Sequence, residues 1–404
     1  MFVAALLVRG GWGTLRLIRA DDPFLLEFPD EQQYWSMAAS LRDGSGLKDE
    51  LGFQATRMPL YPAALSLAAG SGRGILVAKA MQWMVGALVA VLTAGAATTL
   101  FDRRVGLVAG LLVAFDPFLA FFSSLLLTET PFVAALVALW WILAPSMRTG
   151  AGSPGRWVVV GLIAALTVYL RESALGLVVL VLGLVVMFRR FDRRVLSGAA
   201  IAGGFVLVAL VPLAARNQRV TGEWYWLTTR GGISLYDGVG PCATGASNLG
   251  NIKQMPAVRG LSEAKWNRWF LDQSFDAIKG DPGRILRLAG VKLARMWNPF
   301  PNVETYQSRL VRVVSAAWTL PTFACAMVGA LLLLIRNKKD GVRIALFLLL
   351  PAVYLSVLHS LFIGSVRYRL GAIPMLEILA AVAFVAMLDR VREKRATREG
   401  ALAD

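Results

Sequence analysis

Histidine and cysteine are almost absent from this sequence of 404 residues. The one histidine, His359, lies in an apolar stretch, so neither a histidine base with a partner nor a histidine metal cluster is available. We expect it to pack within a helix. Of the two cysteines, Cys242 lies in a polar region and Cys325 in an apolar run, which argues against a disulfide between them and excludes a thiolate metal site.

Acidic residues are scarce relative to basic ones, 26 against 42, and the net charge is +16. Such an excess could suggest a nucleic-acid partner, but the basic residues are distributed between apolar runs, which is typical of membrane topology. We therefore expect no nucleic acid as a partner. No G-x-x-x-x-G-K-S/T sequence occurs either, so ATP-driven transport has no support from a motif.

Apolar residues are abundant, and 56% of the chain is hydrophobic, which is more than a soluble globular domain carries. We predict an all-α polytopic membrane protein with about ten transmembrane helices. The predicted spans are 1–19, 76–100, 105–122, 125–144, 157–170, 173–188, 195–215, 313–335, 342–362 and 371–389.

The distribution of basic residues predicts the orientation of these spans. If the N-terminus is cytoplasmic, most arginines and lysines of the short connections lie inside, as the positive-inside rule requires. The short outside loops then hold Arg171, Arg367 and Arg369. These three arginines are exceptions to the positive-inside rule, and their presence needs a reason. We expect a multi-pass protein of the plasma (inner) membrane with its active site on the extracytoplasmic face.

The hydropathy profile divides the chain into four parts. We predict an N-terminal transmembrane module at 1–215 with a first outer loop at 20–75, an extracytoplasmic domain at 216–312, the last transmembrane helices at 313–389, and a basic cytoplasmic tail at 390–404.

The predicted extracytoplasmic domain has two unlike halves. Its first half, rich in glycine and asparagine, predicts irregular loops and short strands. Its second half predicts helices at 261–279 and 282–297. Asp281 fits an N-cap between them, and Pro282 fits the first helical position.

The first outer loop brings an acid and an arginine to one water-lipid boundary. Asp30 and Glu31 follow a proline, and a short helix with one apolar face follows them. Arg57 stands before a proline-stiffened turn where a phosphate could be held. Asp30 with Gln33 also fits a capping box, in which the acid would only start the helix.

Short motifs occur in a fixed order: D-E-x-x-Y at 30–34, G-x-G at 44–46, R-x-P-L-Y-P at 57–62, T-E at 128–129 and R-Y-R at 367–369. The set resembles the lipid-phospho-sugar glycosyltransferases of the GT-C superfamily, and specifically the protein-mannosyltransferase and aminoarabinose-transferase-like family (glycosyltransferase family 39-like). The resemblance implies a GT-C-like bundle of transmembrane helices with outer juxtamembrane helices and a small extracytoplasmic domain. It also implies a polyprenyl-phosphate-linked sugar as the donor.

The acids receive catalytic roles from this resemblance. Asp30 matches the essential carboxylate, which removes or orients the acceptor's proton while the phosphate departs. Glu31 matches the second acid of the mannosyltransferase pair, and its alternative is a solvated side chain. Glu129 lies where an outer connection re-enters the membrane, either as part of the site or as a charge at a helix N-terminus.

Cations are expected around the departing phosphate, because a developing negative charge needs preorganised donors. Arg57 occupies the place of a phosphate-binding basic residue in the relatives, and Tyr61 of the same turn is assigned to the donor. Arg171 is a further candidate, and its alternative is an ion pair with Glu172.

Arg367 and Arg369 resemble the family's late arginine motif. Alternation along an extended segment would put both side chains on one side, where they would bind the donor phosphate. The alternative role for this pair is anchoring to lipid headgroups at the interface.

Aromatic side chains are predicted on the acceptor side. Tyr34, Trp224 and Tyr236 would cover the cavity and select the acceptor, because aromatic faces suit sugar rings and lipid interfaces, although such residues also form cores. No cofactor is expected beyond the donor lipid. A divalent metal is not expected, because no D-x-D sequence stands in the outer loop.

We therefore predict a membrane glycosyltransferase that transfers a sugar, with inversion, from a polyprenyl-phosphate donor to an acceptor on the extracytoplasmic side. The partners are the lipid bilayer, the donor lipid, and a protein, lipid or glycan acceptor. Two alternatives stay open. One is a flippase or transporter of a lipid-linked sugar, and the other is a lipid-diphosphate-dependent glycan polymerase or ligase of the same superfamily.

Overall fold

The computed structural model describes residues 1–148, 150, 153–336 and 340–400, and these contain helices but no strand. The first half contains α1 (Phe2–Arg19), α2 (Pro29–Arg42), α3 (Leu60–Ser66), α4 (Gly74–Leu100), α5 (Arg103–Phe115), α6 (Pro117–Phe122), α7 (Glu129–Arg148), α8 (Pro154–Leu170), α9 (Ala174–Phe188) and α10 (Arg193–Thr221). The second half contains α11 (Gly231–Val239), α12 (Leu249–Lys253), the 3₁₀ helix η1 (Pro256–Val258), α13 (Glu263–Gly280), α14 (Pro282–Met296), η2 (Glu304–Tyr306), α15 (Arg309–Arg336), α16 (Asp340–Leu361), η3 (Val366–Gly371) and α17 (Ile373–Gly400).

Among the described residues, five helices are long and apolar enough to cross a membrane: α4, α7, α10, α15 and α16. The apolar helices α8 and α9 are shorter. Each of these seven helices overlaps a span predicted from the sequence, which supports an integral membrane protein. The count of ten spans and the orientation stay predictions.

The predicted span 105–122 is wrong in one respect, because the structure divides it into α5 and α6. Pro117 has no N–H group to continue the hydrogen bonds of α5. The Asp116 carboxylate instead accepts the N–H of Leu119 at 2.7 Å, which caps a new helix. The next helix also begins later than predicted, at Glu129, because residues 123–128 form turns and bends.

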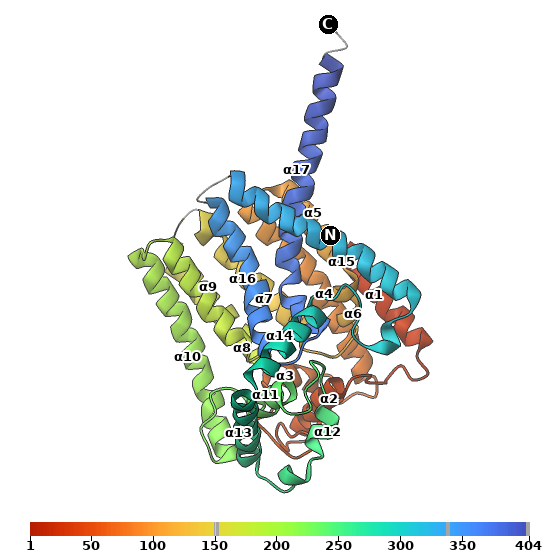
Figure 1. Ribbon diagram of the computed structural model, residues 1–404, viewed down its shortest axis with the longest axis vertical. Coiled ribbons are helices and arrows are strands. Elements are labelled where there is room, and N and C mark those ends of the chain that lie inside the picture. Colours follow the sequence, from red (N-terminus) through yellow and green to blue (C-terminus); the bar gives the residue numbers. More distant parts are fainter. Residues whose placement is uncertain (149, 151–152, 337–339, 401–404) are drawn as a thin grey trace.

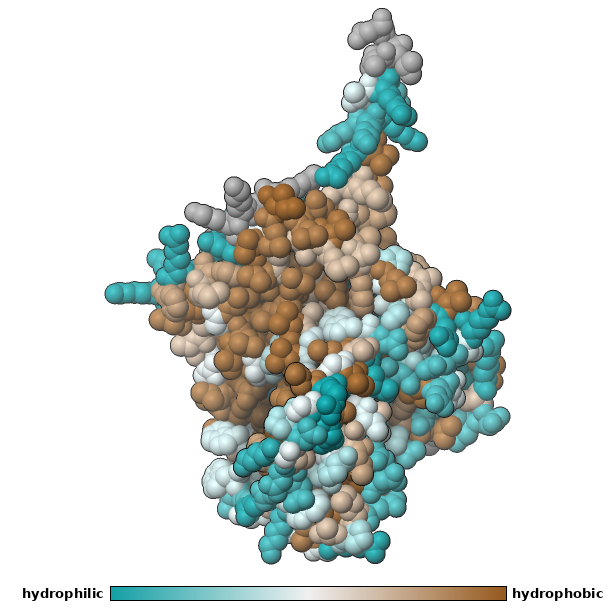
Figure 2. Space-filling view, in the orientation of Figure 1, coloured by the Kyte–Doolittle hydropathy of each residue, from teal (hydrophilic) through white to brown (hydrophobic). Residues whose placement is uncertain are grey.

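The apolar helices form a bundle (Figure 1). Residues 222–308 are named the outer region after their predicted side. Its helices α11, α12 and α13 lie at one end together with α2 and α3, and α17 projects from the opposite end. Figure 2 shows hydrophobic side chains over α9, α10 and α16, and hydrophilic ones over the outer region and over the end of α17. An apolar band between two polar ends fits a body embedded in a membrane.

The outer region begins at Gly222. Helix α10 continues to Thr221, past the predicted boundary at 215, and Gly222 ends it with a left-handed φ of 81°. Helices α13 and α14 match the two predicted helices, and the Asp281 carboxylate caps α14 by accepting the N–H of Arg284 at 2.8 Å. The predicted strands do not occur in the described part of this region.

The predicted tail at 390–404 is a continuation of α17 as far as Gly400, and residues 401–404 lie outside the described residues. Closer to the bundle, α17 packs with its backbone near that of α15. A Cβ built on Gly329 of α15 would lie 1.9 Å from the carbonyl oxygen of Leu379 in α17. A larger residue at Gly329 therefore requires the two helices to separate.

We expect Gly329→Ala to lower the melting temperature of the detergent-solubilised protein, because overpacking of this kind costs about 1–3 kcal/mol. Gly203→Ala in α10 is the control, since nothing lies within 4 Å of the Cβ it would carry. Helix propensity should make this control neutral or stabilising by up to about 1 kcal/mol. Equal melting temperatures for the two variants would contradict the close contact.

Candidate active site

Helix α2 begins at its N-cap Phe28 and places the neighbouring acids Asp30 and Glu31 in different surroundings. The Glu31 carboxylate is fully buried and accepts the N–H groups of Glu27 (3.0 Å), Phe28 (3.1 Å) and Leu126 (2.7 Å). Burial raises the pKa of Glu31, and the hydrogen bonds from Leu126 and Phe28 oppose the rise in part. Glu31, and not Asp30, thus takes part in the capping box of α2, as the acid at its third position. The catalytic role of Glu31 stays a prediction.

Arg57, from the loop before α3, forms an ion pair with Asp30. Its guanidinium group also donates to Gln33 Oε1 at 2.9 and 2.6 Å and to the Tyr34 hydroxyl at 3.3 Å. The Gln33 amide donates to Asp49 at 3.2 Å, and the Asp49 carboxylate accepts two N–H groups of the same loop. The outer loop is therefore folded so that its acid and its arginine meet.

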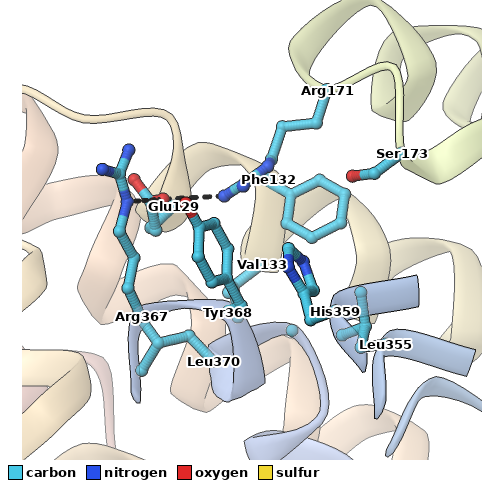
Figure 3. A pocket seen from close by; sticks show the side chains of 11 residues that line it. Glu129, Phe132, Val133, Arg171, Ser173, Leu355, His359, Arg367, Tyr368 and Leu370 are labelled. Carbon is cyan, nitrogen blue, oxygen red and sulfur yellow. Dashed lines mark hydrogen bonds and ion pairs between the residues drawn. The ribbon is translucent and has the colours of Figure 1, made fainter. Parts of the chain in front are cut away.

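Arg367 of η3 joins the two acids Asp30 and Glu129. Its Nη1 lies 2.5 Å from Asp30 Oδ2, and its Nε donates to Glu129 Oε1. Arg171, which ends α8, approaches the same Glu129 oxygen at 2.7 Å, and Figure 3 shows the two arginines reaching Glu129 from opposite sides. Arg171 does not form the alternative pair with Glu172, whose carboxylate accepts a hydrogen bond from the outer region.

Arg230 comes from the outer region, and the sequence analysis missed it. Its guanidinium group lies 3.8 Å from Asp30 Oδ1 and donates to Gln33 Oε1 at 3.3 Å. It precedes α11 in the sequence T-T-R-G-G at 228–232. The signal available in the sequence was a cation before a glycine pair in a region expected to face the site.

Six side chains thus form one ion cluster at this end of the bundle. They are Asp30, Glu129, Arg57, Arg171, Arg230 and Arg367. Four guanidinium groups against two carboxylates leave two positive charges in excess. Such an excess suits an anionic group with several acceptor oxygens, such as a phosphate.

Asp30 is the acid of this cluster that an incoming molecule can reach. Its side chain is 22% exposed, whereas that of Glu129 is 1% exposed. Burial alone would raise the pKa of Asp30, but the charges of Arg57, Arg367 and Arg230 outweigh this effect and hold the pKa well below its usual value. Asp30 is therefore ionised in the ligand-free protein.

The predicted grouping of Arg369 with Arg367 is wrong in geometry. The segment is the 3₁₀ helix η3 and not an extended strand, so side chains two positions apart point in different directions. Arg369 is 1% exposed and its Nη1 donates to the carbonyl oxygens of Met296 (3.2 Å) and Asn298. It caps the end of α14 and lies outside the ion cluster.

The predicted aromatic residues fall into separate places. Tyr34 is buried beneath Arg57, and its ring meets Tyr61 edge to face with centroids 5.1 Å apart. The Tyr61 hydroxyl is buried without a hydrogen-bond partner among the described residues. Tyr236 packs into a small core of the outer region, and Trp224 is 63% exposed. The acceptor roles of Trp224 and Tyr236 stay predictions.

A small pocket borders the ion cluster at Glu129, Arg171 and Arg367 (Figure 3). Tyr368 and His359 line it, with their rings stacked at a centroid distance of 3.9 Å. His359 Nδ1 lies 3.2 Å from the carbonyl oxygen of Ile363. The histidine is thus packed at the end of its helix, as the sequence predicts.

No group of three or more histidine, cysteine, aspartate or glutamate side chains in the described ranges is placed to hold a metal ion. Asp30 and Glu129 both form ion pairs with guanidinium groups. Metal independence itself stays a prediction.

Several solved structures share this fold. The archaeal oligosaccharyltransferase AglB from Archaeoglobus fulgidus, in complex with an inhibitory peptide and a dolichol-phosphate, matches with a TM-score of 0.62 and 15% identity over 99% of this chain and 52% of its own. ArnT from Cupriavidus metallidurans, bound to undecaprenyl phosphate, matches with a TM-score of 0.58 and 15% identity over 95% of this chain and 59% of its own. AglB has also been solved in complex with Zn and sulfate.

These neighbours are glycosyltransferases of the GT-C superfamily, and the likeness confirms the GT-C fold that the sequence resemblance implied. At this identity the likeness concerns the fold alone. The chain spans 52% and 59% of the lengths of the two proteins. No protein-family model matches the chain, and no curated protein matches it.

We expect Glu31→Ala to lower the melting temperature of the detergent-solubilised protein. Three N–H groups lose their acceptor, and that of Leu126 is buried, where an unsatisfied group costs about 1–3 kcal/mol. Glu31→Gln keeps one acceptor oxygen, so its melting temperature should lie between those of Glu31→Ala and the wild-type protein. If Glu31→Ala instead lowered sugar transfer without changing the melting temperature, the result would support the catalytic role predicted for Glu31.

Proposed function

We propose that this protein is a membrane glycosyltransferase that transfers a sugar, with inversion, from a polyprenyl-phosphate donor to an acceptor on the extracytoplasmic side. One observation carries the proposal. A reachable, ionised Asp30 lies among Arg57, Arg230 and Arg367 at a polar end of an apolar bundle. Such a cluster places a base and a phosphate site together at a lipid boundary.

The donor lipid is proposed on two grounds. The excess positive charge of the ion cluster suits a phosphate, and the apolar bundle beside it suits a long hydrocarbon tail. The fold neighbours AglB and ArnT were solved with dolichol-phosphate and undecaprenyl phosphate, which supports the same class of donor here. In this arrangement the phosphate lies against Arg57, Arg230 and Arg367.

The proposed reaction is a single displacement at the anomeric carbon of the donor sugar. The acceptor's hydroxyl oxygen forms a bond to this carbon, the bond from the carbon to the phosphate oxygen breaks, and the electron pair leaves with the phosphate. Asp30 takes the proton of the hydroxyl group. The polyprenyl phosphate gains negative charge, which the surrounding guanidinium groups stabilise. One displacement inverts the anomeric carbon.

The contacts of Asp30 also suggest an order of binding. A carboxylate held by three guanidinium groups is a weak base, because they stabilise its ionised form. A bound phosphate shares these groups and so weakens their hold on Asp30. Donor binding would therefore raise the basicity of Asp30 before the acceptor arrives, while Glu129 keeps Arg171 and Arg367 in place.

We expect Asp30→Asn to retain donor binding and to lose sugar transfer. The asparagine cannot accept the proton, and loss of a general base typically lowers a rate by about 10²–10⁴-fold. Affinity for undecaprenyl phosphate should be unchanged or higher, since the arginines lose a competing anion. Transfer would be measured in membranes supplied with labelled polyprenyl-phosphate sugars, and lipid affinity on the purified protein.

Asp272→Asn is the matched control for this substitution, because Asp272 is an exposed acid of α13. It should leave both transfer and lipid affinity unchanged. Normal transfer by Asp30→Asn would refute the role of Asp30. If the wild-type protein moved a lipid-linked sugar across vesicle membranes without transferring it, the protein would be a carrier.

The low pKa of Asp30 predicts a pH dependence. The group is ionised above its folded-state pKa, which lies below the usual value of about 3.9, and it protonates only as the pH falls through that lower value. We therefore expect kcat/KM for the donor to show no decline due to Asp30 between pH 7 and about pH 4. An acid-side decline centred near pH 5 to 6 would show that the arginines do not hold Asp30 in this way.

A further inference from the structure

We infer that Glu263 is a positioning residue that holds together the two loops carrying Arg57 and Arg230, and so sets the spacing of their guanidinium groups. The inference rests on the proposed function, in which these two groups receive the donor phosphate. Glu263 lies outside the ion cluster, and none of the sequence motifs includes it.

Glu263 is the first residue of α13, and only 7% of it is exposed. Its Oε2 accepts the N–H of Gln54 at 2.8 Å, and its Oε1 accepts the N–H of Ala55 at 2.8 Å. The hydroxyl group of Thr229 also donates to Oε1. One carboxylate therefore binds two loops that are far apart in the sequence.

Each partner of Glu263 lies beside an arginine of the ion cluster. Ala55 stands two residues before Arg57, and Thr229 stands directly before Arg230. The two loops also bond to each other, since the N–H of Thr229 donates to the carbonyl oxygen of Ala55 at 3.0 Å. The clamp, defined as Glu263, Gln54, Ala55 and Thr229, thus fixes both arginine-bearing loops at one point.

Two further contacts hold the first loop from the outer region and the bundle. Phe53 packs edge to face against Trp266 of α13, with ring centroids 5.6 Å apart. Arg216 of α10 donates to the carbonyl oxygen of Gln54 at 2.8 Å. Helix α13 therefore contacts the Arg57 loop through Glu263 and Trp266. Glu263 also contacts the Arg230 loop.

The ordinary explanation of an acid at this position is a favourable interaction with the N-terminus of its own helix. That explanation accounts for the negative charge of Glu263 but not for three donors from two distant loops. The two N–H groups and the hydroxyl group stabilise the nearly buried carboxylate of Glu263. These donors lose their acceptor when the carboxylate is removed. The geometry points to a contact whose loss would loosen both loops together.

Hydrogen exchange of the full-length protein in detergent tests the clamp without any assay of activity. Glu263→Ala should speed the exchange of amides at 53–57 and 228–231, because both segments lose their shared acceptor. Asp281→Ala is the matched control. It removes an acid at the N-terminus of the neighbouring α14 and should leave these amides unchanged.

Affinity for undecaprenyl phosphate tests the positioning role. Glu263→Ala should raise the Kd by about tenfold or more, since small displacements of binding groups are costly, and Glu263→Gln should restore part of the affinity. In an Arg57→Ala/Arg230→Ala background, Glu263→Ala should have no further effect on the Kd. A merely structural role would add the same increment in both backgrounds.

Unchanged exchange in Glu263→Ala, or faster exchange with unaltered lipid affinity, overturns the inference. If Glu263→Ala does not yield folded protein, Thr229→Val removes only the hydroxyl donor and should change exchange at 228–231 and the Kd in the same directions; unchanged values again overturn it. A wild-type protein that does not bind undecaprenyl phosphate overturns the proposed function, and the positioning role with it, even where exchange responds as expected.

Discussion

The bridge that Arg367 makes between Asp30 and Glu129 is the contact on which the rest of the site depends. It ties α2, α7 and η3 together at the margin of an apolar bundle, where an unpaired charge is costly. Three further arginines pair with the same two acids: Arg57 and Arg230 with Asp30, and Arg171 with Glu129. Because the guanidinium groups outnumber the carboxylates, both acids are paired and two positive charges remain to bind an anion.

Buried cations serve a second purpose in this fold, which is to terminate helices away from water. Arg9 is fully buried and donates to the carbonyl oxygens of Val113 and Ala114 at 3.0 Å each, at the end of α5. Lys292 does the same at the end of α16, and Arg369 at the end of α14. The last carbonyl groups of a helix have no partner within it. In this chain, the basic residues that cap helix ends are therefore separate from those that pair with carboxylates. Only the second group is a candidate for binding an anionic ligand.

Five of the six members of the ion cluster were predicted. Asp30, Arg57, Glu129 and Arg367 stand in motifs that resemble those of the family, and Arg171 interrupts an apolar stretch. Arg230 was missed, because a cation in a polar region is ordinary and tertiary contacts of its loop bring it to Asp30. Arg369 was grouped wrongly with Arg367, since sequence does not distinguish a 3₁₀ turn from an extended segment. The helical spans followed from hydropathy, whereas the break at Asp116 depends on a local cap.

Arg367 follows Asp30 in the chain by 337 residues. Synthesis proceeds from the N-terminus, so the first acid reaches the membrane long before its cationic partner has been translated. The bridge between Asp30 and Glu129 consequently forms only after η3 has been translated. A nascent chain arrested before η3 holds both carboxylates without the guanidinium group that joins them.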